Sequence, residues 1–307
     1  MARCGTGRLR ICVVGEGMLE LSRSGDGWRL GYGGDTLNTA IHLVRYGHSV
    51  AFLTALGDDP FSADLRADWA AEGLDTSLTL TDPAHTAGLY AIRTDDAGER
   101  SFAYWRSDSA ARRTFALPGI EAALAEAEQA DALVFSLITL AVLPPDARGR
   151  LFELCAAVRA RGGKVVFDGN YRPRLWGSTA EATAARDAAI AHADIGLPTL
   201  DDESLLNPGA TADTVAALWQ GRGCGETVVK LGPQGCRLPD GRIIAPPQVL
   251  VPRDTSGAGD AFNAGFLDAR LRGAPIAEAA LAGHRLAGWV VTRAGAIPAR
   301  SDNAPYT

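Results

Sequence analysis

The stretch that decides the fold is residues 132–168, ALVFSLITLAVLPPDARGRLFELCAAVRARGGKVVFD. It begins with one short apolar run, 132–136, and ends with another, 164–168. Between them, residues 147–161 carry apolar side chains at helical spacing. Apolar runs of this length are typical of strands buried on both faces, as in parallel sheets. The stretch therefore predicts two strands of a mainly parallel sheet with a covering helix between them.

The same alternation continues on both sides of this stretch. Apolar runs at 10–15, 50–56, 194–197 and 227–231 predict further strands. A chain in which such strands alternate with amphipathic helices forms a doubly wound α/β sheet flanked by helices on both faces. The predicted helices span residues 36–46, 65–71, 120–129, 180–191, 211–220, 257–272 and 276–292.

A small β-sheet lid is predicted near the start of the chain. Residues 18–22 and 28–32 are typical of strands of a half-exposed antiparallel sheet, and residues 88–93 and 101–106 resemble them. The lid thus consists of two separate pieces, about 16–33 and 86–108, inserted into the body. Because no Pro/Ser-rich linker divides the chain, we predict a single α/β domain over residues 1–307.

Composition excludes several classes of function. The formal net charge is -6 and no Lys/Arg run exceeds two residues, so a nucleic-acid partner is not expected. No signal-peptide pattern and no run of about 18 apolar residues occurs, so we expect a cytoplasmic protein without a membrane partner. The cysteines are odd in number and lack a CxxC pair, which predicts unpaired thiols. They are Cys4, Cys12, Cys155, Cys224 and Cys236.

Residues 254–262, DTSGAGDAF, form the most informative motif. A glycine-rich turn leads directly into an apolar helix, where free N–H groups and the helix dipole attract an anion such as a phosphoryl group. Asp260 falls in the first helical turn, where its carboxylate could accept the proton of an attacking hydroxyl. The alternative is that Asp260 only caps the helix, because aspartate is common in first turns.

This motif resembles the second signature of the ribokinase-like (PfkB) carbohydrate kinases. The segment 33–40, GGDTLNTA, resembles their first signature, Gly-Gly-x-x-x-Asn-x-Ala, although a Gly-Gly pair can also mark a simple turn. The resemblance spans roughly residues 11–298 and implies that Asp260 is the catalytic base. It also implies an anion hole at the amides of Gly257, Ala258 and Gly259. The sugar would be bound by Gly33, Gly34, Asp35 and Asn38.

Two further segments resemble the nucleotide site of the family. Residues 228–235, VVKLGPQG, are similar to its strand followed by Lys-x-Gly-x-x-Gly. Residues 198–203, PTLDDE, lie where relatives carry an Asn-x-x-Glu motif linked to Mg²⁺, with Thr199 in place of the Asn. Asp202 or Glu203 could supply the acid, and we assign Glu203 as the candidate for Mg²⁺. ATP would be bound by Lys230, Gly232, Gly235, Thr255, Gly257 and Gly259.

The sugar itself is predicted to be acidic. Residues 104–111, YWRSDSAA, resemble the YxR…SAA segment of 2-keto-3-deoxygluconate kinases. Residues 167–176 resemble a D-x-N-x-R segment that those enzymes share with fructokinases. A guanidinium fork suits a carboxylate, so Arg106 and Arg172 are the candidates, with Tyr90 and Tyr104 bonding the other oxygens. Any of the four could instead be an ordinary surface or packing residue.

The sequence thus predicts an ATP-dependent kinase that phosphorylates a hydroxyl of 2-keto-3-deoxygluconate. A fructokinase or ribokinase acting on a neutral sugar is the nearest alternative. A nicotinamide-dependent oxidoreductase is disfavoured because Gly15-Glu16-Gly17 lacks the third glycine of the dinucleotide fingerprint. A non-catalytic nucleotide sensor is disfavoured because Asp260 and its glycines are present. By family resemblance, the protein would form a homo-oligomer through the lid.

Overall fold

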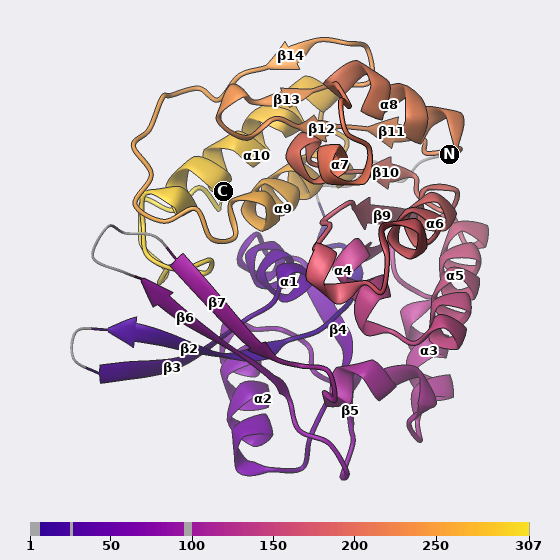
Figure 1. Ribbon diagram of the computed structural model, residues 1–307, viewed down its shortest axis with the longest axis vertical. Helices are drawn as coiled ribbons and strands as arrows, with labels where there is room; N and C mark the ends of the chain where they lie inside the picture. The colour runs from indigo at the N-terminus through magenta and orange to yellow at the C-terminus, as the bar shows by residue number, and fades with distance from the viewer. Residues whose placement is uncertain (1–6, 25–26, 95–99, 307) are drawn as a thin grey trace.

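The centre of the molecule is a seven-stranded sheet in which every neighbouring pair of strands is parallel (Figure 1). The computed structural model describes residues 7–24, 27–94 and 100–306. The strand order is β11-β10-β9-β8-β1-β4-β5. The strands are β1 (Arg10–Val14), β4 (Ser49–Leu56), β5 (Thr79–Thr81), β8 (Ala132–Ser136), β9 (Lys164–Asp168), β10 (Ile195–Gly196) and β11 (Glu226–Thr227).

Helices cover both faces of this sheet, which explains why its strands are apolar along their whole length. Successive residues of β1 show the division: Cys12 and Val14 belong to one buried cluster, and Ile11 and Val13 belong to the other. The first cluster also contains α3 (Ile120–Ala127), α4 (Leu137–Val142), α5 (Pro145–Ala160), α6 (Thr179–Ile190) and α8 (Ala212–Gly221). The second contains α1 (Asp35–Arg45), α2 (Pro60–Glu72), α9 (Ala258–Leu271) and α10 (Ile276–Val291).

The lid is a separate four-stranded sheet of order β3-β2-β6-β7 that extends away from the helices of the body (Figure 1). Its two hairpins are antiparallel, but β2 and β6 pair in parallel, so the prediction of an antiparallel sheet was wrong for this central pairing. A parallel pairing needs a long connection, which the elements between β3 and β6 supply. The strands are β2 (Met18–Ser24), β3 (Gly27–Gly33), β6 (Gly88–Thr94) and β7 (Arg100–Trp105).

The predicted strand at 227–231 is divided between two sheets. Residues 226–227 pair in parallel with β10, whereas β12 (Val229–Lys230) pairs antiparallel with β13 (Cys236–Arg237), which pairs with β14 (Ile243–Ile244). The helices α4 and α7 (Leu200–Leu206) were not predicted, because both are short and follow a strand almost directly. Both begin at the carboxyl edge of the central sheet, where open α/β sheets bind their ligands.

The cysteine side chains of the described residues are unpaired, as predicted. Four thiols are free and buried, and Cys4 lies outside the described residues. They are Cys12, Cys155, Cys224 and Cys236. Within the described ranges, no helix combines the length and the apolar character needed to cross a bilayer.

Candidate active site

A pocket of about 2300 Å³ lies at the carboxyl edge of the central sheet. Its walls come from the lid strands, from the ends of β9 and β12, and from the start of α9. All the site residues predicted from the sequence line this pocket, except Gly33 and Glu203. The fold therefore brings together segments that lie more than 200 residues apart in the chain, at 34–38 and 255–260.

The turn before α9 has the geometry of an anion site. The helix starts at Ala258, and Gly257 precedes it with φ +67°, in the left-handed region that favours glycine. A Cβ atom at Gly257 would also lie 2.5 Å from the Cβ of Ala296. The first amides of a helix have no acceptor within the helix, and the dipole adds positive potential there. Gly257, Ala258 and Gly259 line the pocket at this turn, and the N–H of Ala258 donates to the carbonyl of Thr255 at 3.3 Å.

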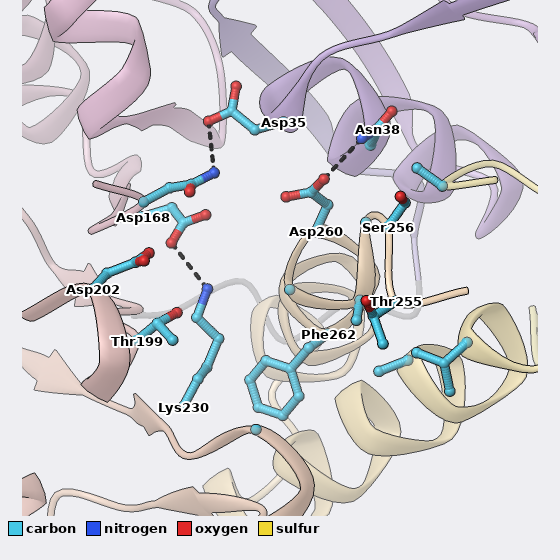
Figure 2. Close-up of a pocket in the computed structure, with 18 of the residues that line it drawn as sticks. Asp35, Asn38, Asp168, Thr199, Asp202, Lys230, Thr255, Ser256, Asp260 and Phe262 are labelled. Carbon is cyan, nitrogen blue, oxygen red and sulfur yellow. Dashed lines mark hydrogen bonds and ion pairs between the residues drawn. The ribbon is translucent and has the colours of Figure 1, made fainter. Parts of the chain in front are cut away.

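Asp260 lies in the first turn of α9 with its carboxylate facing the pocket (Figure 2). The side-chain amide of Asn38 donates to its Oδ2 atom at 2.8 Å, and the hydroxyl of Thr39 donates to its backbone carbonyl at 3.3 Å. Burial and the nearby charge of Asp35 raise the pKa of Asp260 to about 8, although the bond from Asn38 opposes the shift. Such a carboxyl group is poised to exchange a proton near neutral pH.

The end of the pocket that is predicted to bind the sugar, called the sugar end below, contains Asp35, Asn38 and Gly34. Asp35 accepts from the amide of Asn170 at 3.2 Å, and burial raises its pKa. The Oδ1 atom of Asn38 is buried without a hydrogen-bond partner among the described residues, so it can still accept from a ligand. Gly34 is required by packing, since a Cβ atom there would lie 2.2 Å from the carbonyl oxygen of Glu16.

The lid contributes an aromatic wall to the same end. Tyr90 and Tyr104 stack with ring centroids 6.0 Å apart, and both line the pocket. The hydroxyl of Tyr90 donates to Glu20, a bond that contributes to a raised pKa of the phenol after the larger effect of burial. Gly33 lies behind this hydroxyl and leaves it room, because a Cβ atom there would lie 2.2 Å from it. Gly33 therefore shapes the wall without lining the pocket.

Lys230, at the end of β12, belongs to a buried ring of three polar side chains. Its Nζ donates to Asp168 at 2.9 Å (Figure 2). It also donates to Asn263 at 3.1 Å, and the amide of Asn263 donates to Asp168 at 2.9 Å. An ammonium group has three donors, so one remains for a ligand in the pocket. Gly232, Gly235 and Thr255 line the same pocket.

The two arginines predicted to bind a carboxylate already face carboxylates of the protein. Arg106 forms a short ion pair with buried Glu16, and its side chain is 9% exposed. Arg172 donates to Asp202 at 3.1 Å, and its side chain is 51% exposed. Both still line the pocket. The guanidinium groups thus keep free N–H edges, but their charge is partly neutralised.

The assignment of Glu203 to a metal site is corrected by the structure. Glu203 is 1% exposed, and its two oxygens accept from Arg186 at 2.6 Å and from Trp219 at 2.9 Å. It points into the protein, whereas Asp202 lines the pocket. One residue along a helix turns the side chain by about 100°. The acidic run 201–203 could not reveal which acid faces the pocket.

Several residues at the pocket wall or directly behind it were not assigned from the sequence: Asp168 and Asn170 line the pocket, whereas Asn263 and Glu16 lie behind it. Asp168 and Asn170 belong to the D-x-N-x-R segment, and their place directly after a buried strand was the available signal. Asn263 lies one turn after Asp260 on α9, and helical spacing could have suggested it. For Glu16, which contacts Arg106, the sequence contains no such signal.

Comparison with known proteins identifies the family of this chain. A family model described as pfkB family carbohydrate kinase matches residues 9–303, and the chain belongs to this family. The chain is 40% identical over 297 residues to the 2-dehydro-3-deoxygluconokinase of Dickeya dadantii, covering 94% of this chain and 96% of that protein. The fructokinase of Vibrio alginolyticus is 29% identical, over 84% of this chain and 83% of that protein.

A solved structure gives the same result. Aminoimidazole riboside kinase from Salmonella enterica, in complex with aminoimidazole riboside and an ATP analog, superposes with a TM-score of 0.78 at 26% identity. The match covers 94% of this chain and 95% of that one. The predicted family and the ribokinase-like fold are therefore confirmed.

Proposed function

We propose that the protein transfers the γ-phosphoryl group of ATP to a hydroxyl of 2-keto-3-deoxygluconate, also called 2-dehydro-3-deoxygluconate. The observation that carries the proposal is the carboxylate of Asp260, held by Asn38 beside the amides that start α9. The choice of substrate is supported by the relatives of that name, which are 38–40% identical to this chain, and by the arginines at the pocket wall.

In the proposed reaction, Asp260 accepts the proton of the substrate hydroxyl. The hydroxyl oxygen forms a bond to the γ-phosphorus, the bond between this phosphorus and the β–γ bridging oxygen breaks, and ADP leaves with the bond's electron pair. The amides of Gly257, Ala258 and Gly259 stabilise the charge on the group in transfer. Lys230 donates its remaining N–H to the phosphates, and Gly232, Gly235 and Thr255 form the nucleotide wall. Positioning and electrostatics supply most of the rate.

Mg²⁺ is the proposed metal. No group of three or more His, Cys, Asp or Glu side chains suited to hold a metal occurs among the described residues. Mg²⁺ bound to a nucleotide needs only one or two protein carboxylates, because the phosphates and water supply the other ligands. Asp202, at the pocket, fits this role, and the metal would neutralise phosphate charge there.

Turnover of different sugars by the purified protein tests the proposal. ATP consumption is measured with 2-keto-3-deoxygluconate, fructose and ribose under identical conditions. We expect kcat/KM to be highest for the sugar acid. If no sugar leads to ATP consumption, the kinase proposal is wrong and a non-catalytic nucleotide-binding protein is the remaining alternative.

A neutral sugar is the second candidate, and one observation favours it. Arg106 and Arg172 are paired with Glu16 and Asp202, which reduces the positive charge available to a substrate carboxylate. Faster turnover of fructose or ribose in the same experiment would support a fructokinase or ribokinase.

We further propose that two copies associate through the lid. In a strand, residues two apart share a face, so Trp28 and Leu30 lie together. By the strand register, Trp105 shares their face, opposite to the face of Tyr90 and Tyr104. Trp28, Leu30 and Trp105 are 48%, 45% and 61% exposed. Sedimentation of the wild type and of Trp105→Ser tests this: only the wild type should form the oligomer.

A cytoplasmic location remains a prediction.

A further inference from the structure

The lid is joined to the body by four chain crossings, and Glu16 lies in one of them and close to the other three. Glu16 itself lies in the first crossing, between β1 and β2. Gly34 lies in the second, with its hypothetical Cβ atom 2.2 Å from the carbonyl oxygen of Glu16. Gly88 begins β6 after the third, and its Cβ atom would lie 2.7 Å from the Glu16 carboxylate. Arg106 and Ser109, in the fourth crossing, contact that carboxylate directly.

The Glu16 side chain is fully enclosed at this point. The residue is 1% exposed, and Oε1 accepts from the hydroxyl of Ser109 while Oε2 faces the Nη2 atom of Arg106. A buried carboxylate is tolerated only where such partners compensate its lost hydration. The glycines at 34 and 88 leave the space that this arrangement needs.

Arg106 connects this buried group to the pocket. Arg106 lines the pocket, whereas Glu16 does not. Glu16 engages one edge of the guanidinium, and the Nε atom of Arg106 is buried without a hydrogen-bond partner among the described residues. A guanidinium has five N–H donors, so others remain for a ligand. Because Glu16 fixes one edge, it also fixes where the free edge points.

We propose that Glu16 is a positioning residue that holds Arg106 at the sugar end of the pocket and ties the four lid crossings together. Binding of a sugar acid then depends on a carboxylate that never touches it. The inference concerning the substrate rests on the proposed function, in which Arg106 binds the carboxylate of the sugar acid. The tie between the crossings does not depend on it.

The kinetic test uses Glu16→Gln, which keeps the shape of the side chain but removes its charge. Loss of a charge-assisted contact that orients Arg106 should raise the KM for 2-keto-3-deoxygluconate roughly tenfold or more, with the KM for ATP unchanged and kcat within about threefold. Arg106→Gln should raise the same KM. The double variant should have the KM of Arg106→Gln alone, because Glu16 acts on the substrate only through Arg106. An unchanged KM in Glu16→Gln, or effects that multiply in the double variant, would overturn the proposal.

Glu121→Gln is the matched control. Glu121 pairs with Arg150 at 2.6 Å but is 80% exposed and does not line the pocket. The same Glu-to-Gln change there should leave both KM values unchanged. A KM rise in this control equal to that of Glu16→Gln would count against a specific role of Glu16.

A second measurement does not require turnover of the sugar acid. The amide of Ala110 donates to the carbonyl of Thr86 at 2.9 Å and so joins the third and fourth crossings. In Glu16→Gln, hydrogen exchange at this amide should accelerate at least roughly tenfold relative to Glu121→Gln, because the tie is weakened. An unchanged exchange rate at Ala110 in Glu16→Gln would contradict the proposal that Glu16 holds the crossings together. If the wild-type protein does not phosphorylate the sugar acid, the proposed function is wrong. The hydrogen-exchange measurement still tests whether Glu16 holds the lid crossings together.

If Glu16→Gln does not fold, Ser109→Ala takes its place in both measurements. It removes the partner of Oε1 but leaves the Arg106 ion pair in place. Exchange at Ala110 should then accelerate, while the KM for the sugar acid should change less than in Arg106→Gln. Slow exchange in Ser109→Ala, as in the wild type, would contradict the proposal.

Discussion

Asn38 donates its side-chain amide to the carboxylate of Asp260 at 2.8 Å, across 222 residues of sequence. The bond joins the two segments that carry the glycine-rich motifs and fixes one carboxylate oxygen of Asp260. The second oxygen is thereby left for the pocket. The proposed catalytic base is thus oriented by a residue that was predicted only to bind sugar.

Replacement of this carboxylate should nearly abolish turnover. Asp260→Asn keeps an oxygen acceptor for Asn38 but cannot take a proton, so kcat should fall roughly 10²–10⁴-fold. Steady-state ATP consumption measures the loss. Asp268→Asn, on the same helix and bonded to His48 outside the pocket, should keep kcat. A kcat near the wild-type value in Asp260→Asn would exclude Asp260 as the base.

The pH dependence of turnover should report the same group. The pKa of Asp260 is raised to about 8, first by burial and then by the charge of Asp35, and only the ionised carboxylate can accept a proton. Therefore, kcat/KM, which reports the free enzyme, should rise about tenfold per pH unit below pH 8 and level off above it. The residual activity of Asp260→Asn should lack this slope. A flat wild-type profile between pH 6 and 8 would be inconsistent with the raised pKa.

The raised pKa also predicts how stability changes with pH. The pKa of Asp260 moves from an ordinary value of 3.8 in the unfolded chain to about 8 in the fold, so between these values the unfolded chain releases a proton that the fold retains. Stability is therefore lost as pH rises through this window. Asp260→Asn does not ionise and should unfold at a higher temperature than wild type, with a larger difference at pH 8 than at pH 5. Calorimetry measures the unfolding temperatures of the two proteins at pH 5 and pH 8. An equal difference at the two pH values would contradict the raised pKa of Asp260.

Glu203 and Asp202 should respond differently to loss of their charge. Glu203→Gln leaves Arg186 without its buried partner and should lower the free energy of unfolding by about 3 kcal/mol, with the Mg²⁺ dependence of kcat unchanged. Asp202→Asn should instead raise the Mg²⁺ concentration needed for half-maximal rate. Urea unfolding and Mg²⁺ titration separate the two effects. A shifted Mg²⁺ dependence in Glu203→Gln would restore the original assignment.

Arg172 should contribute to binding of an acidic substrate. Loss of a fork contact with a carboxylate in Arg172→Ala should raise the KM for 2-keto-3-deoxygluconate roughly ten- to hundredfold, with a smaller change for a neutral sugar. Arg161→Ala is a matched control, because its side chain is 52% exposed against 51% for Arg172 and it lies outside the pocket. If both variants bind the acid as wild type does, the carboxylate lies elsewhere.

Local sequence patterns predicted every strand of the central sheet except β5, the covering helices except α4 and α7, and the glycine-rich turn before α9. Strands such as 132–136 are apolar throughout because both faces are buried, and this pattern is visible in a short window. The turn at 257–260 was equally readable, because glycine freedom and helix polarity are local properties. The acidic residue in that turn was therefore identified before its surroundings were known.

The contacts between side chains in the site could be identified only from the packing of elements that are distant in the sequence. The partners of Asp260, Lys230 and Arg106 lie 222, 62 and 90 residues away in the chain, at Asn38, Asp168 and Glu16. Packing also places Asp202 rather than Glu203 at the pocket, and it divides residues 226–230 between two sheets. Local propensity carries no information on such contacts. Their energies depend on burial and on partners that only the complete fold brings together.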